Sequence, residues 1–184
     1  RIADVIKHAG VARGTFYIYF KDKSDIALQV LSDFRKSMLT TKSLNLAEHD
    51  WRTKTYLTNL YFAEVHQLNA GLLRAFYQFV DEADQFQEMR HATDKRWVRR
   101  LSSTYLRALG LPNSNSRRAE MERRLHAVRV MIEGLCMQIY VEAMPDMVRL
   151  FPQPHDVALT ATELWIQAIE ATSDNEPNEL RNVG

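Results

Sequence analysis

The chain has 184 residues, of which 46% are hydrophobic and 26% charged, as in a globular protein with a sizeable core. Six glycines and five prolines are too few for the turns of an all-β fold, so an all-α fold is expected. A single cysteine, Cys136, excludes an intramolecular disulfide and favours the cytoplasm. No apolar run approaches the roughly 20 residues that span a bilayer, so we expect no membrane partner.

Two short helices are predicted at the start of the chain. The first covers residues 2–9, because its apolar residues recur at helical spacing. Gly10 is expected to end it, since glycine tolerates the positive φ of a helix C-terminus. The second covers residues 13–19, and its inward residues Phe16 and Phe20 form a small core with Val11. Asp22 is the expected N-cap of a third helix over residues 23–41.

A polar linker over residues 42–50 then predicts a boundary between two domains. The domains are residues 1–45 and residues 46–184. Asp50 is expected to cap a helix over 51–68, and Gly71 to separate that helix from one over 72–81. Three longer helices are predicted over 84–109, 117–143 and 156–172, with Gly110 ending the first of them.

The opening residues have the pattern of a helix-turn-helix. Two short helices joined by the turn Ala9-Gly10-Val11 fit this motif, whose second helix enters the DNA major groove. Residues 1–23 hold five basic and two acidic side chains, a local net charge of +3 on a nearly neutral chain. Gly14 is a poor helix former, which indicates that a phosphate or a base approaches the backbone there.

The segment AGVARGTFYIYFKDKSDI resembles the DNA-binding signature of the tetracycline-repressor (TetR) family of bacterial regulators. That signature runs Ala-Gly-Val, a small turn residue, Gly-Thr-x-Tyr-x-x-Phe, and then a lysine that opens the next helix. Ala12 departs from it, because the family usually has a serine or threonine cap there. The family also has a helix before this motif, so we expect sequence upstream of Arg1.

The resemblance implies that residues 13–19 are the recognition helix of a regulator of operator DNA. Contacts to the phosphate backbone are expected from Thr15, Tyr17, Tyr19 and Lys23. Contacts to base edges are expected from Arg13, Gly14 and Ile18. Alternatively, the two tyrosines pack against a neighbouring helix, Lys21 and Lys23 are only solvated, and Arg13 contacts only a phosphate.

The resemblance also implies that the C-terminal domain forms a homodimer. The helices over 117–143 and 156–172 would pair with their mates in a four-helix bundle, with Gly134 allowing close approach. Their expected apolar faces are Val128, Met131, Ile132 and Leu135 on one helix and Leu159, Leu164, Trp165 and Ile169 on the other. The alternative is that these faces only complete the core of a single chain.

A small-molecule effector, unidentified and largely apolar, is the other partner that the family implies. Aromatic and methionine side chains suit an adaptable apolar pocket, although they suit a plain core equally well. The candidate effector residues are Phe62, His66, Phe76, Trp97, Met137 and Tyr140.

No pattern typical of an enzyme is found in the sequence. It has no glycine-rich phosphate loop and no paired-cysteine metal site, so we expect neither catalysis, nor a cofactor, nor a metal. The arginines between residues 90 and 129 alternate with acidic residues, which favours an ion-paired face over a second DNA surface. The predicted function is a ligand-released repressor. One alternative is an activator or a regulator whose input is not a small molecule. The other is a helical ligand-binding or protein-interaction module that does not read DNA.

Overall fold

The computed structural model describes residues 1–38, 46, 48–80 and 84–172, and within its helices it leaves out the side chains 35, 37, 38, 76–80, 84–87, 89, 90, 92 and 93. The chain divides into two compact units, Arg1–Ser43 and Leu44–Gly184. The fold is all-α, and the described residues contain no strand. In this part of the chain, no helix has the length and apolar character needed to cross a membrane.

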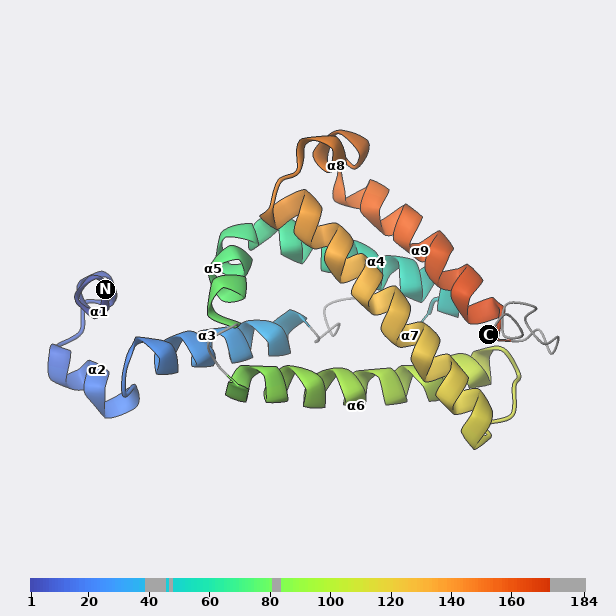
Figure 1. Ribbon diagram of the computed structural model, residues 1–184, viewed down its shortest axis with the longest axis horizontal. Coiled ribbons are helices and arrows are strands. Elements are labelled where there is room, and N and C mark those ends of the chain that lie inside the picture. The colour runs from blue at the N-terminus through green and yellow to red at the C-terminus, as the bar shows by residue number, and fades with distance from the viewer. Residues whose placement is uncertain (39–45, 47, 81–83, 173–184) are drawn as a thin grey trace, which may run out of the picture. The chain divides into compact units, whose positions relative to one another are not determined.

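The first unit, called the head below, contains α1 (Ile2–Ala9), α2 (Arg13–Tyr19) and α3 (Lys23–Met38) (Figure 1). Gly10 ends α1 with φ +64°, and the Val11 amide donates to the Ile6 carbonyl at 3.3 Å. This is the outer hydrogen bond of a Schellman turn. Asp22 accepts from the Asp25 amide at 2.9 Å, which confirms it as the N-cap of α3. The predicted end of this helix at residue 41 lies outside the described residues.

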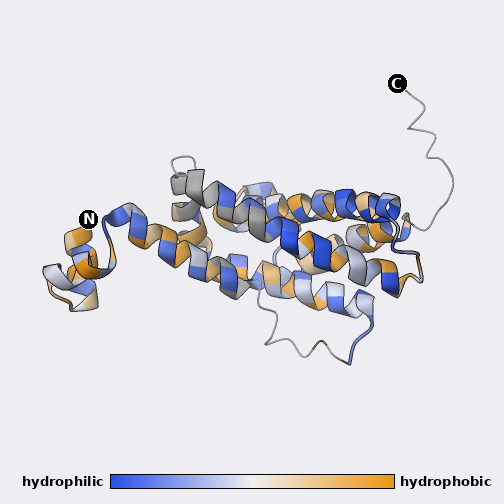
Figure 2. Ribbon diagram, turned by 90° about the horizontal axis from the view of Figure 1, so that it is seen from below, coloured by the Kyte–Doolittle hydropathy of each residue, from blue (hydrophilic) through white to orange (hydrophobic). Residues whose placement is uncertain are grey.

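The second unit contains α4 (Trp51–Leu68), α5 (Ala70–Val80), α6 (Asp84–Ala108), α7 (Asn115–Cys136), a π-helical turn η2 (Met137–Val141), α8 (Pro145–Leu150) and α9 (Pro154–Glu170). Helix α4 packs against α9, α7 packs against both α6 and α9, and α5 packs against η2. Their ribbons alternate between hydrophobic and hydrophilic stretches, as expected of helices with one buried face (Figure 2).

The core of the second unit lies where α4, α6, α7 and α9 meet. Leu106, Leu125 and Ile169 are completely buried, and each contributes roughly 2 kcal/mol by leaving water. Val128, Ile132, Trp165 and Ile169 belong to this core. The prediction that these four residues face a partner chain is therefore wrong, because they pack inside their own chain.

Polar side chains define the ends of α4. Asp50 accepts from the amides of Arg52 at 2.8 Å and Thr53 at 3.2 Å, which confirms the predicted cap. These hydrogen bonds, with one from the Thr53 hydroxyl as the strongest, hold the pKa of Asp50 below its usual value. The predicted break at Gly71 is wrong, since Asn69 separates the helices by donating its side-chain amide to the Val65 carbonyl at 2.8 Å.

The predicted helix over 117–143 is interrupted near its end. Helix α7 stops at Cys136, and η2 follows, where the Glu142 amide donates to the Met137 carbonyl five residues back at 2.9 Å. Ala143 then has φ +53°, which is uncommon for a residue with a Cβ. From α5, the Arg74 guanidinium donates to the Val141 carbonyl with an Nε–O distance of 3.1 Å.

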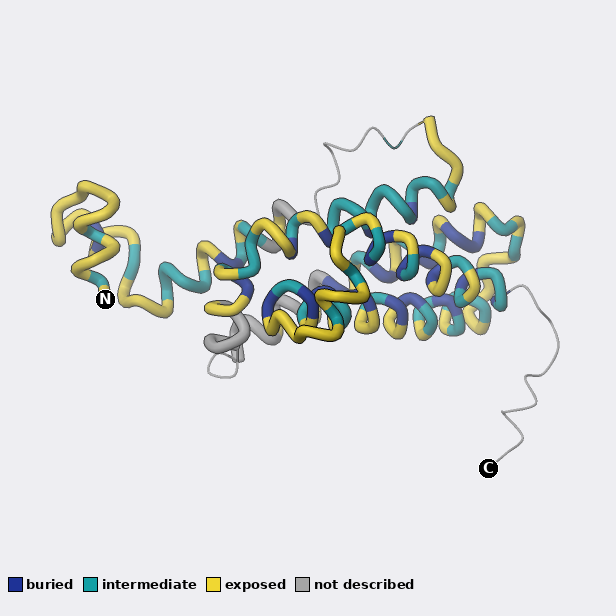
Figure 3. Tube along the Cα trace, turned by 90° about the horizontal axis from the view of Figure 1, so that it is seen from above, coloured by how far each residue is buried: buried dark blue, intermediate teal, exposed yellow. Residues whose placement is uncertain are grey.

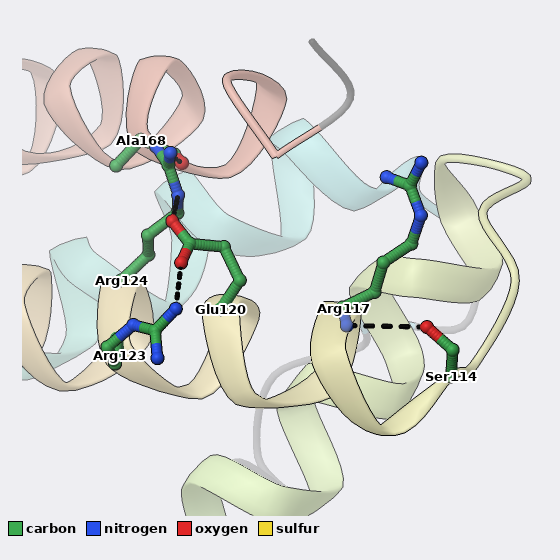
Figure 4. Close-up of polar contacts among 6 residues, drawn as sticks. All are labelled: Ser114, Arg117, Glu120, Arg123, Arg124 and Ala168. Carbon is green, nitrogen blue, oxygen red and sulfur yellow. Dashed lines mark hydrogen bonds and ion pairs between the residues drawn. The ribbon is translucent and has the colours of Figure 1, made fainter. Parts of the chain in front are cut away.

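Arginine side chains tie α7 to α9 (Figure 4). The Glu120 carboxylate lies between Arg123 and Arg124, and the Arg124 Nε contacts it at 2.9 Å. Arg124 also donates to the Ala168 carbonyl at 3.0 Å, and Arg117 donates to the Thr172 carbonyl at 3.1 Å. These cations satisfy carbonyls at the C-terminal end of α9, where positive charge is favourable. The Arg123 hydrogen bond is the main reason why the pKa of Glu120 is low.

Candidate nucleic-acid interface

One aromatic ring anchors α2 in the head. Phe16 is 4% exposed, and its ring centroid lies 5.5 Å from that of Phe20 and 5.3 Å from that of Tyr17. Leu31 of α3 is 5% exposed. The predicted place of Val11 in this core is wrong, because the Schellman turn leaves its side chain 39% exposed. Most of α1 and α2 falls in the exposed class (Figure 3).

The remaining side chains of α2 face outward. Ile18 is 77% exposed, Tyr19 73% and Tyr17 47%, and Arg13 and Thr15 are also exposed. Large apolar side chains at this exposure are not held by packing within the head, so the alternative in which Tyr19 packs against a neighbouring helix is not favoured. The outward face combines aromatic, aliphatic, hydroxyl and cationic groups, which is the chemistry that contacts phosphates, sugars and base edges.

The backbone at the start of α2 is open to a close approach. A Cβ added to Gly14 would meet nothing within 4 Å, so no packing inside the chain requires glycine at this position. Ala12 precedes the helix with φ −70° and ψ 150° and supplies no side-chain cap. Both features leave the first turn of α2 uncrowded by its own chain.

Two cations lie beside this face. The Arg13 guanidinium carbon is 5.9 Å from the centroid of the Tyr17 ring, within the range of a cation–π interaction. This contact positions the guanidinium at the first residue of the helix. Lys23 opens α3 and its side chain is exposed. The Asp22 and Asp25 carboxylates are both engaged by backbone amides at the start of α3.

A family model described as bacterial regulatory proteins, tetR family, matches residues 1–30. This match covers the head and does not extend over the second unit. No curated protein and no solved structure matches the chain. The head is thus similar to the DNA-binding segment of TetR-family regulators, with α1 and α2 at the two helices of a helix-turn-helix.

The structure places the expected effector residues on four elements of the second unit. Phe62 and His66 are adjacent on α4, with ring centroids 4.1 Å apart. Met137 and Tyr140 lie together in η2. Trp97 packs edge-on against Trp165, with centroids 6.1 Å apart. The sixth residue, Phe76, is on α5, and its side chain lies outside the described residues.

The sequence interpretation did not anticipate two features near these residues. The π-helical turn carries two of the candidates, and a hydrophobic period of 3.6 residues cannot reveal such a turn. A buried ionic cluster links α6 to α7, where Arg129 Nη1 lies 2.7 Å from Glu133 Oε2 and 3.4 Å from Asp94 Oδ2. Cys136 is fully buried, and burial raises the pKa of its thiol to about 12, as in an inert core cysteine.

His66 is a buried titratable group. It is 2% exposed, and its Nδ1 is 2.8 Å from the Phe62 carbonyl, so Nδ1 carries the proton and donates. Burial lowers the pKa of the imidazole below 6.5, although this hydrogen bond and the Glu133 charge oppose the shift. The folded protein therefore keeps His66 neutral.

Replacing His66 should change how stability depends on pH. The unfolded chain binds a proton at His66 as pH falls through 6.5 and the folded chain resists it, so the free energy of unfolding should decrease over this range. His66→Asn retains an N–H donor but cannot titrate, so its profile should be flatter there. Urea unfolding can be followed by tryptophan fluorescence, since Trp51, Trp97 and Trp165 all lie in the second unit.

The matched control is His126→Asn, which changes an exposed histidine of α7 and should keep the wild-type pH profile. Identical profiles for His66→Asn and the wild type would contradict this account.

Proposed function

We propose that the chain is a ligand-responsive repressor of the bacterial cytoplasm, which binds a palindromic operator as a homodimer and is released by a small-molecule effector. The observation that carries this proposal is the outward face of α2 within the family-matched segment, where Ile18 is 77% exposed. Ile18 is thus left largely unpacked by the described residues of the head, and an apolar side chain in that position suits contact with a thymine methyl group in the major groove.

The seven residues proposed to contact DNA, six on α2 and one at the start of α3, have two different roles. Phosphate and sugar contacts set the position of the head, and base contacts set the sequence preference. The positioning residues are Thr15, Tyr17, Tyr19 and Lys23. The base-reading residues are Arg13, whose planar guanidinium matches guanine, Gly14, which allows close approach, and Ile18.

Substitutions on α2 should separate these two roles. Arg13→Ala should weaken operator binding by about 1–3 kcal/mol and relax the preference at one base pair, as expected for loss of a bidentate contact. Tyr17→Ala should weaken binding to all duplexes similarly. A gel-shift titration on the upstream promoter DNA at fixed salt measures both effects. Arg149→Ala, which changes an exposed arginine of α8, is the control.

Normal operator binding by both α2 variants would disprove the recognition-helix assignment. A wild-type chain that binds no duplex with preference would favour the alternative, a helical module that does not read DNA.

The outer surfaces of α7 and α9 support the homodimer. These two helices pack together and still expose Val130, Met131, Leu159 and Leu164, each between 42% and 56%. Nothing of the chain lies within 4 Å of a Cβ placed on Gly134, so another helix could approach closely there. A two-fold axis would bring the same patch from both chains together. Such a dimer would hold two heads at the spacing of two half-sites.

Charges introduced into this patch should dissociate the dimer. The double variant Met131→Glu/Leu164→Glu would bury four carboxylates in the two-fold interface, so it should be a monomer by light scattering at micromolar concentration. Operator affinity should fall at least tenfold as a consequence. Val148→Glu on α8 changes an equally exposed apolar residue outside the patch and should remain dimeric. A wild-type chain that is monomeric under these conditions would rule out the proposed assembly.

We propose that the effector binds near η2 in the second unit, with Phe62, His66, Phe76, Trp97, Met137 and Tyr140 as its contacts. The Tyr140 hydroxyl supports this location, because it is buried and has no hydrogen-bond partner in the described part of the chain. Burial raises the pKa of Tyr140 to about 12, so the group is a neutral donor. A largely apolar molecule with one hydrogen-bond acceptor fits these contacts.

Nile red, an apolar dye with hydrogen-bond acceptors, can probe this site. We expect saturable dye fluorescence with the wild-type dimer and weaker operator binding in its presence, because a ligand that prefers the released state must lower DNA affinity. Met137→Glu should abolish the saturable signal, and Met144→Glu, at a 44% exposed methionine, should preserve it. Equal dye binding by both variants, each confirmed as folded by circular dichroism, would place the effector elsewhere.

A further inference from the structure

Between residues 95 and 107, the exposed charged side chains of α6 are all positive. Five basic side chains are exposed on this helix, namely Lys95, Arg96, Arg99, Arg100 and Arg107, and we call them the α6 basic face. Because each residue advances the helix by 100°, these positions fall within an arc of about 140°. Val98 and Tyr105, which are buried, lie outside this arc on the other side of the same turns. Packing in the core thus fixes which way the basic face points.

The nearest exposed carboxylate that the structure describes on this side of α6 is that of Glu88, about two turns before Lys95. Between residues 95 and 107 the sequence has no Asp or Glu. Asp94, just before it, is 7% exposed and contacts Arg129 of α7. Among the residues that the structure describes, none forms an ion pair or hydrogen bond with the side chains of the five cations.

The arginines of α7, in contrast, form ion pairs and hydrogen bonds. Arg123 and Arg124 pair with Glu120, Arg129 pairs with Asp94 and Glu133, and Arg118 donates to Asn113. Arg117 donates to the Thr172 carbonyl. The prediction of an ion-paired face thus holds for α7 and is wrong for α6. Residues 44–184 hold sixteen basic and nineteen acidic side chains, so five unpaired cations on one face are not a consequence of overall composition.

We propose that the α6 basic face binds the phosphate backbone of duplex DNA, as a sequence-independent contact that adds to those of the head. The face extends over about 18 Å, at 1.5 Å per residue. One DNA strand presents a phosphate every 3.4 Å along the helix axis, so about five phosphates lie within that length. Four of the five cations are arginines, whose planar fork can bond two phosphate oxygens at once.

Duplex DNA is favoured over an acidic polypeptide by two observations. Ser103, which lies among the cations on this face, is small and hydrophilic, whereas protein interfaces are typically centred on aromatic or aliphatic residues. The chain also carries the head of a DNA-binding family, so duplex DNA is a polyanion that it meets. The proposal needs duplex binding only and does not depend on a repressor role, a particular operator or an effector.

The test is the salt dependence of DNA binding by the full-length chain. Arg96→Gln/Arg99→Gln/Arg100→Gln removes three charges and keeps side chains that favour helix. Affinities for an operator duplex and for a non-cognate duplex of equal length are measured by fluorescence anisotropy between 50 and 300 mM salt. The slope of log K against log salt should become shallower by about 0.9 per lost phosphate contact, hence by about two to three.

Three controls make the outcome decisive. Arg96→Lys/Arg99→Lys/Arg100→Lys keeps the charge and should keep the slope. Arg13→Ala should reduce operator preference and leave the contribution of α6 on the non-cognate duplex in place. Polyglutamate of matched charge should bind at least tenfold more weakly than the duplex. Circular dichroism melting shows whether the glutamine variant is folded, and if it is not, Arg99→Gln and Arg100→Gln are measured singly, each with an expected change of about 0.9.

The proposal is overturned if folded glutamine variants keep the wild-type slope on both duplexes, or if polyglutamate binds as tightly as DNA through these arginines. If the recognition-helix assignment is wrong, the result differs: Arg13→Ala keeps the wild-type operator preference, and the α6-dependent slope is intact.

Discussion

The outward face of α2 depends on the burial of Phe16. Helix α2 has only seven residues, too few to be stable alone, so its position depends on the one side chain that it buries. Within the described head only Phe16 and Leu31 are buried, and α1 contributes no buried residue. This small core leaves the other side chains of α2 exposed and directed away from their own chain. The exposure of Ile18 and Tyr19 is thus the consequence of anchoring a short helix by one residue.

Local chemistry explains why much of the fold could be predicted from sequence. Gly10 and Gly110 adopt positive φ where helices end, and Asp22 and Asp50 accept the amides of the helices that they precede. These effects involve residues within five positions of each other, so a single sequence contains them. Asn69 shows the limit of this reasoning. The sequence predicts a break at Gly71, yet α4 ends two residues earlier, where the Asn69 side-chain amide donates to a carbonyl of the preceding turn.

Tertiary packing determines which partner an apolar or charged helix face meets, and the sequence pattern alone does not contain that information. Periodicity identifies an apolar face but not its partner, so Val128 and Trp165 could belong equally to the core or to a dimer interface until the packing of α7 on α9 was known. Likewise, the order of charges in the sequence does not show which arginines find an anionic partner. In sequence, α6 and α7 both look like mixtures of acidic and basic residues. In the fold, Asp94 is buried beside Arg129, so residues 95–107 of α6 expose cations and no carboxylate.

The near-neutral total charge is therefore the sum of a basic head and an acidic second unit. Residues 1–43 hold eight basic and four acidic side chains, while the second unit has an acidic excess. At physiological salt, exposed charges farther apart than about 8 Å are screened from one another. DNA therefore responds to each local patch and not to the sum of +1. The buried carboxylate of Asp94, which pairs with Arg129, adds little to the outer potential beside a phosphate, while exposed cations add fully. A chain of almost zero net charge can thus bind a polyanion strongly, because its fold withdraws carboxylates from particular surfaces and leaves the cations there facing solvent.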